Sequence, residues 1–324
     1  VSILKNGNII FGTIKDGVYL TNNNGEIIFH VNKENGLINN TVLGQCVDEN
    51  ETLWLGLDNG IATIDLSNNN YFFNDVSGKL GAVYDVIKFK GVIYLGSNTG
   101  LFYLDINNQL QFIKGSQSQV WDLKEINGEL FCCHNYGTFL VKDKQLVPVC
   151  TDAGGFIIKQ VPEHKNIYIG GSYSGLIRLK KDGSSWKEKH LGKSTMPIRF
   201  LVFEDEKTVW ASHAYKGLYK IKFDDNYDTI TSIENYKNKG VFSEFNVRVY
   251  KIKNDICFRT NDGWLKYEPL LDSIVPYNLI NESFGKNSYL ISEDDMEQMV
   301  LKSSSDVIRF KSLLTDEKDI PLSN

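Results

Sequence analysis

Apolar residues of this chain occur in short runs that are separated by polar turns. The run Leu53–Leu57 is typical, because Asp48–Glu51 precedes it and Asp58-Asn59-Gly60 follows it. Nowhere does an apolar set recur at the three- and four-residue spacing of an amphipathic helix over more than two turns. Short apolar runs between turn residues predict strands. We therefore expect an almost wholly β-sheet chain, with helix confined to isolated turns.

The same pattern repeats along the whole chain. An apolar run, a polar turn and a Gly before an apolar residue occur eight times, with the Gly, or Asp in the last copy, at positions 17, 60, 100, 137, 175, 217, 263 and 306. In the second unit we expect strands at 42–47, 53–57, 62–65 and 71–73, from the innermost outwards. This period and strand number predict an all-β fold, a β-propeller of four-stranded blades. Eight units leave a ring of seven blades and a ring of eight blades both open.

The ends of the chain suggest a segment of a longer protein. The sequence opens Val-Ser-Ile-Leu without an initiator Met, and residues 315–324 are polar and contain Pro321. We expect one propeller domain over residues 1–314, an eighth unit that lacks its outermost strand, and a polar tail over 315–324 that leads to a downstream domain.

Charge and hydropathy exclude two classes of partner. The chain has 35 Lys and Arg against 40 Asp and Glu, evenly spread, so no basic stripe is available to neutralise phosphates. Direct nucleic-acid binding is therefore not expected. The apolar runs are far shorter than the ~20 residues that cross a bilayer, so no membrane insertion by this segment is expected.

Catalytic and metal-binding patterns are missing from the sequence. None of the five His residues lies four positions from another, and no nucleophile elbow, phosphate-binding Gly loop or zinc-protease motif occurs. In Cys132-Cys133-His134, adjacent strand residues point to opposite faces and cannot converge on one ion. We expect no cofactor, no metal, no catalytic residue and no enzyme activity. A propeller lyase or glycosidase stays open as an alternative through Asp85 and Asp122.

Candidate binding residues follow from propeller geometry. Loops that lead into each innermost strand share one face, the axial face, with the turns that join the second and third strands. Polar and aromatic residues expected there are Tyr84, Asp85, Trp121, Asp122, His134, Tyr136, Tyr173, Arg199, His213, Tyr215, Arg248 and Asn261. Aromatic rings beside amide and guanidinium donors suit a glycan or another polar ligand. Arg199 and Trp121 are expected to serve binding, whereas Trp54 is expected to be a core residue.

The second unit resembles a known repeat. Residues 36–42 read Gly-Leu-Ile-Asn-Asn-Thr-Val, and residues 53–61 read Leu-Trp-Leu-Gly-Leu-Asp-Asn-Gly-Ile. This closely resembles the two-component regulator propeller repeat, although only the second unit carries the full pattern. The succession of units over about residues 3–311 is similar to the periplasmic sensor region of membrane-spanning bacterial regulators. In those proteins a triple-tyrosine domain follows the propellers, and a helix-turn-helix or histidine-kinase part provides the output.

The resemblance implies an extracytoplasmic, ligand-sensing propeller of an inner-membrane regulator, with a small molecule or glycan as the ligand. It also implies a neighbouring propeller and a triple-tyrosine domain of the same chain as partners. Such regulators usually carry seven-bladed propellers, whereas eight units occur here. A protein–protein interaction scaffold or a dimerisation propeller remains the alternative.

Overall fold

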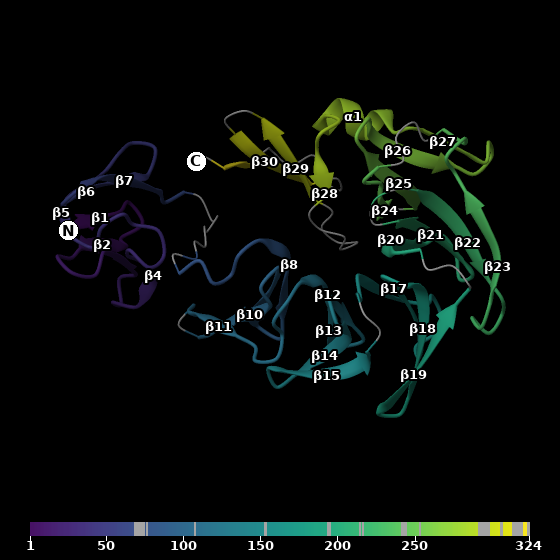
Figure 1. Ribbon diagram of the computed structural model, residues 1–324. Helices are drawn as coiled ribbons and strands as arrows, with labels where there is room; N and C mark the ends of the chain where they lie inside the picture. Colours follow the sequence, from purple (N-terminus) through teal and green to yellow (C-terminus); the bar gives the residue numbers. More distant parts are fainter. Residues whose placement is uncertain are drawn as a thin grey trace. The chain divides into compact units, whose positions relative to one another are not determined.

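In a computed structural model of the chain, the strands form antiparallel sheets in which successive strands are hydrogen-bonded neighbours (Figure 1). The structure describes residues 1–67, 75, 77–106, 108–151, 154–192, 196–213, 215, 217–240, 245–252, 254–290, 299–304, 307–312 and 320–322. Within these ranges there are seven four-stranded sheets and one three-stranded sheet. The chain is therefore an all-β propeller of four-stranded blades, as the repeats predict, and its sheets match the eight repeat units.

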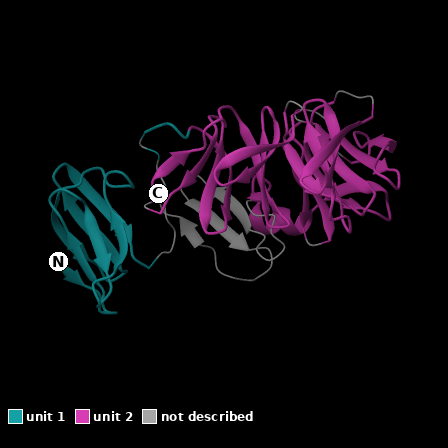
Figure 2. Ribbon diagram, turned by 90° about the horizontal axis from the view of Figure 1, so that it is seen from below, with its two compact units in different colours: residues 1–80 teal, residues 81–324 magenta. Residues whose placement is uncertain are grey.

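The chain divides into two compact units, Val1–Leu80 and Gly81–Asn324 (Figure 2). Unit 1 holds one four-stranded sheet and the three-stranded sheet. The first comprises β1 (Ser2–Ile3), β2 (Ile9–Gly12), β3 (Val18–Thr21) and β4 (Ile27–Val31). The second comprises β5 (Val42–Val47), β6 (Thr52–Leu57) and β7 (Gly60–Asp65). The outermost strand expected at 71–73 lies outside the described residues.

Unit 2 holds six four-stranded sheets. The first three comprise β8 (Val83–Phe89), β9 (Val92–Ser97), β10 (Leu101–Leu104), β11 (Leu110–Phe112); β12 (Val120–Ile126), β13 (Glu129–His134), β14 (Gly137–Lys142), β15 (Gln145–Cys150); and β16 (Ile157–Gln160), β17 (Ile167–Ser172), β18 (Gly175–Asp182), β19 (Ser185–Leu191). The last three comprise β20 (Ile198–Phe203), β21 (Thr208–His213), β22 (Leu218–Phe223), β23 (Ile230–Asn235); β24 (Arg248–Ile252), β25 (Asp255–Thr260), β26 (Gly263–Glu268), β27 (Ser273–Pro276); and β28 (Tyr289–Leu290), β29 (Met299–Ser304), β30 (Val307–Ser312), β31 (Ile320–Leu322).

Strand β31 corrects the expectation for the eighth unit. The unit does have an outermost strand, because Ile320–Leu322 pairs antiparallel with β30 inside the segment that was expected to be a tail. Proline has no N–H to donate to a ladder, and it is tolerated on a strand that has a neighbour on one side only. Pro321 therefore argues for an edge strand and not against a strand altogether.

One short helix interrupts the β structure. Helix α1 (Asn278–Phe284) follows β27 and buries Ile280 and Phe284 in a cluster with Tyr250 and Trp264. Two apolar positions four residues apart are too few for a sequence pattern to reveal a helix. No helix in the described part of the chain is long and apolar enough to cross a membrane.

The apolar core lies in layers between successive sheets. Phe131 and Cys133 of β13 pack with Ile158 and Tyr168 of the next sheet, whereas Cys132 belongs to the layer on the other side. The adjacent cysteines thus face opposite ways, as strand geometry predicts. Both thiols are fully buried, and burial raises the pKa of each above its ordinary value. They act as small apolar side chains in the core.

Trp54 does not occupy the expected core position. Its side chain is 44% exposed, whereas Trp210 at the matching position of β21 is 0% exposed. The indole Nε1–H of Trp54 donates to Asp48 Oδ2 at 2.9 Å. The expectation is not met within unit 1, because no second sheet of that unit covers this face of the three-stranded sheet, which also carries Ile61. A residue at a repeated position is buried only where another sheet covers it.

Candidate functional site

The first strands of the sheets in unit 2 lie beside one another, with β8 next to β12, β12 next to β16, β16 next to β20 and β20 next to β24 (Figure 1). Loops that lead into these strands bond to the preceding sheet, at the turn between its second and third strands. Ser118 N–H donates to Thr99 O at 3.4 Å, Gly154 N–H to Asn135 O at 2.8 Å, and Asn246 N–H to Tyr215 O at 3.1 Å. At these three places the loop into a first strand and the turn of the preceding sheet lie together.

Three of these first strands contain a bulge near their start. In β8 the register passes from Val83 opposite Ser97 to Asp85 opposite Gly96, so Tyr84 has no partner in the ladder. Trp121 in β12 and Arg199 in β20 are skipped in the same way. A bulge leaves one residue unpaired and re-aims its side chain, and bulges are frequent beside functional sites. In unit 1, Leu43 of β5 is skipped likewise.

A glycine lets the neighbouring strand come close just before one of these bulges. A Cβ built on Gly96 of β9 would lie 2.7 Å from Val120 Cγ1, the residue that precedes Trp121. Any larger side chain at position 96 would push β12 away. Gly96 therefore helps to fix the position at which the Trp121 side chain leaves the ladder.

The bulged residues and their neighbours form one group of rings and guanidinium groups. We call it the aromatic–arginine cluster; its members are Tyr84, Trp121, Phe156, Tyr173, Arg199, Phe200 and Arg248. The Tyr84 and Trp121 rings are stacked, with centroids 5.1 Å apart and planes 9° apart. Trp121 and Phe156 lie 5.3 Å apart, and Phe156 meets Tyr173 edge-on at 4.7 Å. The cluster therefore joins residues from five successive sheets through ring contacts and cation–π contacts.

Both arginines lie against aromatic faces. The Arg199 guanidinium carbon is 5.0 Å from the Trp121 ring centroid and 5.5 Å from that of Phe200, and Arg248 lies 5.6 Å from the same Phe200 ring. In the part of the chain that the structure describes, no carboxylate forms an ion pair with either arginine. Burial, followed by the charge of Arg248, lowers the pKa of Arg199, and Tyr84, Tyr215 and Tyr173 oppose this shift. The site is thus positive and only partly solvated.

Tyrosine hydroxyl groups border the cluster. The Tyr173 hydroxyl donates to Asn135 Oδ1 at 2.7 Å. Burial raises the pKa of Tyr173, and the nearby Trp121 indole and the charge of Arg199 partly oppose this effect. Tyr215 is 71% exposed and influences the pKa of both Tyr173 and Arg199, so it belongs to the margin of the cluster.

Asp85 and Asp122 form a second group with Lys124. Asp85 accepts the N–H of Val86 at 2.9 Å and that of Leu123 at 2.7 Å, so its carboxylate joins β8 to β12. Lys124 Nζ lies 3.6 Å from Asp122 Oδ1. Burial and the charge of Asp122 raise the pKa of Asp85 to about 7. Both carboxylates were expected among the ligand-binding residues; Asp85 bonds to the backbone of two sheets, and Asp122 lies beside Lys124 of its own strand.

The two candidate histidines hold turns. His134 Nδ1 accepts the N–H of Tyr136 at 3.1 Å, and His213 Nδ1 accepts the N–H of Tyr215 at 2.9 Å. Hydroxyl oxygens make the same bond at the matching positions Ser97, Ser172 and Thr260. Burial lowers the pKa of both histidines, which favours the neutral ring. His134 is buried, whereas Tyr136 and Asn261 are exposed in turns, and no ring contact links these three to the cluster.

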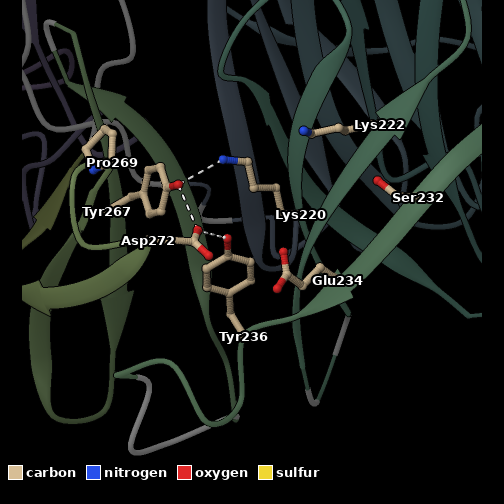
Figure 3. A pocket seen from close by; sticks show the side chains of 8 residues that line it. All are labelled: Lys220, Lys222, Ser232, Glu234, Tyr236, Tyr267, Pro269 and Asp272. Carbon is tan, nitrogen blue, oxygen red and sulfur yellow. Dashed lines mark hydrogen bonds between the residues drawn. The ribbon is translucent and has the colours of Figure 1, made fainter.

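A pocket of about 350 Å³ lies elsewhere, on the outer strands β22, β23 and β26 (Figure 3). Figure 3 shows its polar groups turned toward one another: Asp272 Oδ1 accepts the hydroxyls of Tyr236 at 2.6 Å and Tyr267 at 3.0 Å. Lys220 donates to the Tyr267 hydroxyl at 3.1 Å and pairs with Glu204 at 2.8 Å. Because these groups form hydrogen bonds and an ion pair with one another, we interpret the pocket as a polar contact between two sheets.

Comparison with solved structures supports the fold. The chain is similar to the extracellular domain of BT3049, a protein described as a hybrid two component system of B. thetaiotaomicron, with a TM-score of 0.50 and 15% identity. The match covers 95% of this chain and 49% of that one, so the chain spans about half its length. The β-propeller domain of Cps50 (Swd1) from Myceliophteria thermophila matches with a TM-score of 0.50 and 10% identity, over 79% of this chain and 90% of that one. No family model and no curated protein sequence matches the chain.

Proposed function

We propose that the chain is the extracytoplasmic ligand-sensing propeller of a bacterial signal-transduction or transcription regulator. We further propose that the aromatic–arginine cluster binds the ligand. The repeat of the second unit and the likeness in fold to the extracellular domain of BT3049 support the first part. The function is binding and not catalysis in this proposal, because Asp85 bonds two sheets together and Asp122 lies beside Lys124 of its own strand.

The observation that carries the binding proposal is the position of Arg199. This half-buried guanidinium lies on Trp121 without a carboxylate among the described residues. Withdrawing a charge from water costs several kcal/mol unless a partner compensates it. The stacked Tyr84 and Trp121 rings beside it offer the flat apolar faces that line ligand pockets. A polar ligand with a ring face would satisfy both features.

Thermal shift assays on the full chain with a panel of mono- and disaccharides and organic acids test this function. We expect at least one compound to raise the melting temperature of the wild type. Trp121→Ala and Arg199→Ala should lose this shift while they unfold, without compound, close to the wild type. Tyr136→Ala, an exposed tyrosine outside the cluster, should keep it.

Two results would count against the binding site. A shift that survives both substitutions would place binding elsewhere on the chain. If Trp121→Ala and Arg199→Ala unfold as early as Trp210→Ala, whose parent side chain is 0% exposed, the cluster is structural.

A protein-contact propeller is the second candidate. Within unit 1 taken by itself, the face of the three-stranded sheet that is turned away from the other sheet carries Trp54 and Ile61, which are 44% and 70% exposed. Large apolar side chains gathered on an exposed sheet face mark surfaces that contact other proteins. Analytical ultracentrifugation of the wild type and of Ile61→Lys would show whether self-association depends on this face.

A further inference from the structure

Two arginines of the cluster share one ring. Arg199 of β20 and Arg248 of β24 lie 5.5 Å and 5.6 Å from the Phe200 ring, so two cations from neighbouring sheets meet at one place. A cation–π contact is worth only about 0.5–1 kcal/mol at an exposed site, and it leaves the charge itself in place. The pair therefore keeps a positive charge that nothing in the described part of the chain offsets through an ion pair.

Two other half-buried cations of unit 2 have carboxylate partners, whereas Arg259 lies 4.2 Å from the Tyr289 ring without an ion pair among the described residues. Arg178 of β18 bonds to Asp228 through Nη1 and Oδ1 at 2.7 Å, and Lys220 of β22 pairs with Glu204 at 2.8 Å. Arg178 and Arg199 thus differ in their partners although both are partly buried arginines of the same unit. Burial and the like charge of Arg248 both lower the pKa of Arg199, so the two guanidinium groups repel each other. A third group of negative charge would remove this repulsion.

We infer that the cluster takes a small ligand that combines an anionic group with a flat ring face. The carboxylate, sulfate or phosphate lies between Arg199 and Arg248, and the ring lies beside the Trp121–Tyr84 stack. Guanidinium groups bind such oxyanions through two parallel hydrogen bonds, a geometry that Lys lacks. The Tyr215 hydroxyl influences both Arg199 and Tyr173 and can donate to a further oxygen, whereas the Tyr173 hydroxyl donates to Asn135 and can accept. This inference rests on the proposed binding site and names the chemistry of its ligand.

Isothermal titration of the full chain with matched probes tests the charge requirement. The pairs are benzoate with benzamide and glucuronate with glucose, and inorganic phosphate serves as an anion without a ring. We expect each anionic member to bind at least tenfold more tightly than its neutral partner, and benzoate to bind more tightly than phosphate. Raising NaCl from 50 to 500 mM should weaken benzoate at least fivefold and leave benzamide unchanged, because salt screens charge.

Variants assign the effect to the two arginines. Arg199→Gln and Arg248→Gln should lower the affinity for benzoate to that for benzamide, whereas the matched variant Arg178→Gln should leave it unchanged. Arg248→Lys keeps the charge but loses the paired donors. Its affinity for benzoate should lie between that of the wild type and that of Arg248→Gln. The salt series on the wild type holds as a test even if a variant fails to fold.

The inference fails if charged and neutral partners bind equally, or if benzoate, glucuronate and phosphate all fail to bind. It also fails if phosphate binding survives both Gln substitutions, which would mark a non-specific surface site. None of these results overturns the proposed function by itself. That proposal fails separately, when no compound of the wider panel depends on Trp121 and Arg199.

Discussion

The Tyr84 and Trp121 rings lie parallel, 5.1 Å apart, although the two residues belong to different sheets. Each is the residue that a bulge leaves out of its ladder, in β8 and in β12. Because the bulges free both side chains from the pleat, the rings meet across the gap between two first strands. The stack is a product of backbone register as much as of residue type.

Loss of this stack should cost little stability. We expect Tyr84→Ala to lower the free energy of unfolding by about 0.5–1.5 kcal/mol, the usual worth of one aromatic pair. Urea unfolding of the variant and of the exposed control Tyr136→Ala measures it, and the control should stay within about 0.5 kcal/mol of the wild type. A loss above ~3 kcal/mol would show that Tyr84 is a core residue.

The two tryptophans at matching strand positions should differ in their contribution to stability. Trp210→Ala removes a fully buried ring that contacts Tyr236, Phe258 and Tyr267, and should cost about 3–5 kcal/mol. Trp54→Ala removes a half-exposed ring with one hydrogen bond, and should cost about 1 kcal/mol. Chemical denaturation of both variants compares them. Equal losses would mean that the Trp54 face is covered in solution.

Asp85 should make the chain less stable as the pH rises. Its pKa is about 7 in the folded chain and near 3.8 for an ordinary Asp. Between these values the folded chain binds a proton that the unfolded chain has released, so unfolding becomes easier as the pH rises through this window. Asp85→Asn removes the titrating group and keeps one carbonyl acceptor for the backbone.

Urea unfolding at pH 5 and pH 8 measures the Asp85 effect. The fall in unfolding free energy between these two pH values should be smaller in Asp85→Asn by about 1–2 kcal/mol. Asp58→Asn, an exposed turn residue, serves as the control and should leave the fall unchanged. An unchanged pH dependence in Asp85→Asn would contradict the raised pKa.

His134 should matter for folding and not for ligand binding. His134→Ala leaves the Tyr136 N–H without its acceptor and opens a cavity in a buried position, so we expect a loss of about 2–3 kcal/mol. His134→Ser should recover part of this loss, since Ser holds the same turn at positions 97 and 172. Thermal melts and benzoate titrations separate the two roles. Weaker benzoate binding at unchanged stability would restore His134 as a ligand-binding residue.

The repeats predicted the architecture because a propeller blade is a local unit. Four short runs and their turns follow one another in the chain and pair with their neighbours, so the period alone identifies the sheets. Topology also predicted that loops and turns lie together on one face. This prediction listed five residues that contact one another in the cluster or lie beside it: Tyr84, Trp121, Tyr173, Arg199 and Arg248. Phe156 and Phe200 were missed because apolar residues at strand starts look like ordinary core residues.

The register of individual strands, and which faces of a sheet are covered by another sheet, could not be predicted from the sequence. Phe131 and Tyr168 take the same place in the repeat pattern, yet they pack in one layer from opposite sheets. Tyr168 therefore faces the preceding sheet, whereas Phe131 faces the following one. The register of β17 is shifted by one residue against the repeat pattern, and only the pairing of its strand shows this shift. The role of His134 depends on a hydrogen bond within a turn that Ser, Thr and His all make, so residue type gave no signal.

A residue in a regular strand both pairs in the ladder and packs between sheets, but the bulged residue at the start of β8, β12 and β20 does not pair in its ladder. A side chain in the regular ladder belongs to one of the two layers between sheets, and any change there disturbs folding. Tyr84, Trp121 and Arg199 belong to neither layer, so each can be replaced with a small effect on the neighbouring sheets. Substitutions at these three positions can therefore change the chemistry of the proposed site one blade at a time while the layers between the sheets stay the same.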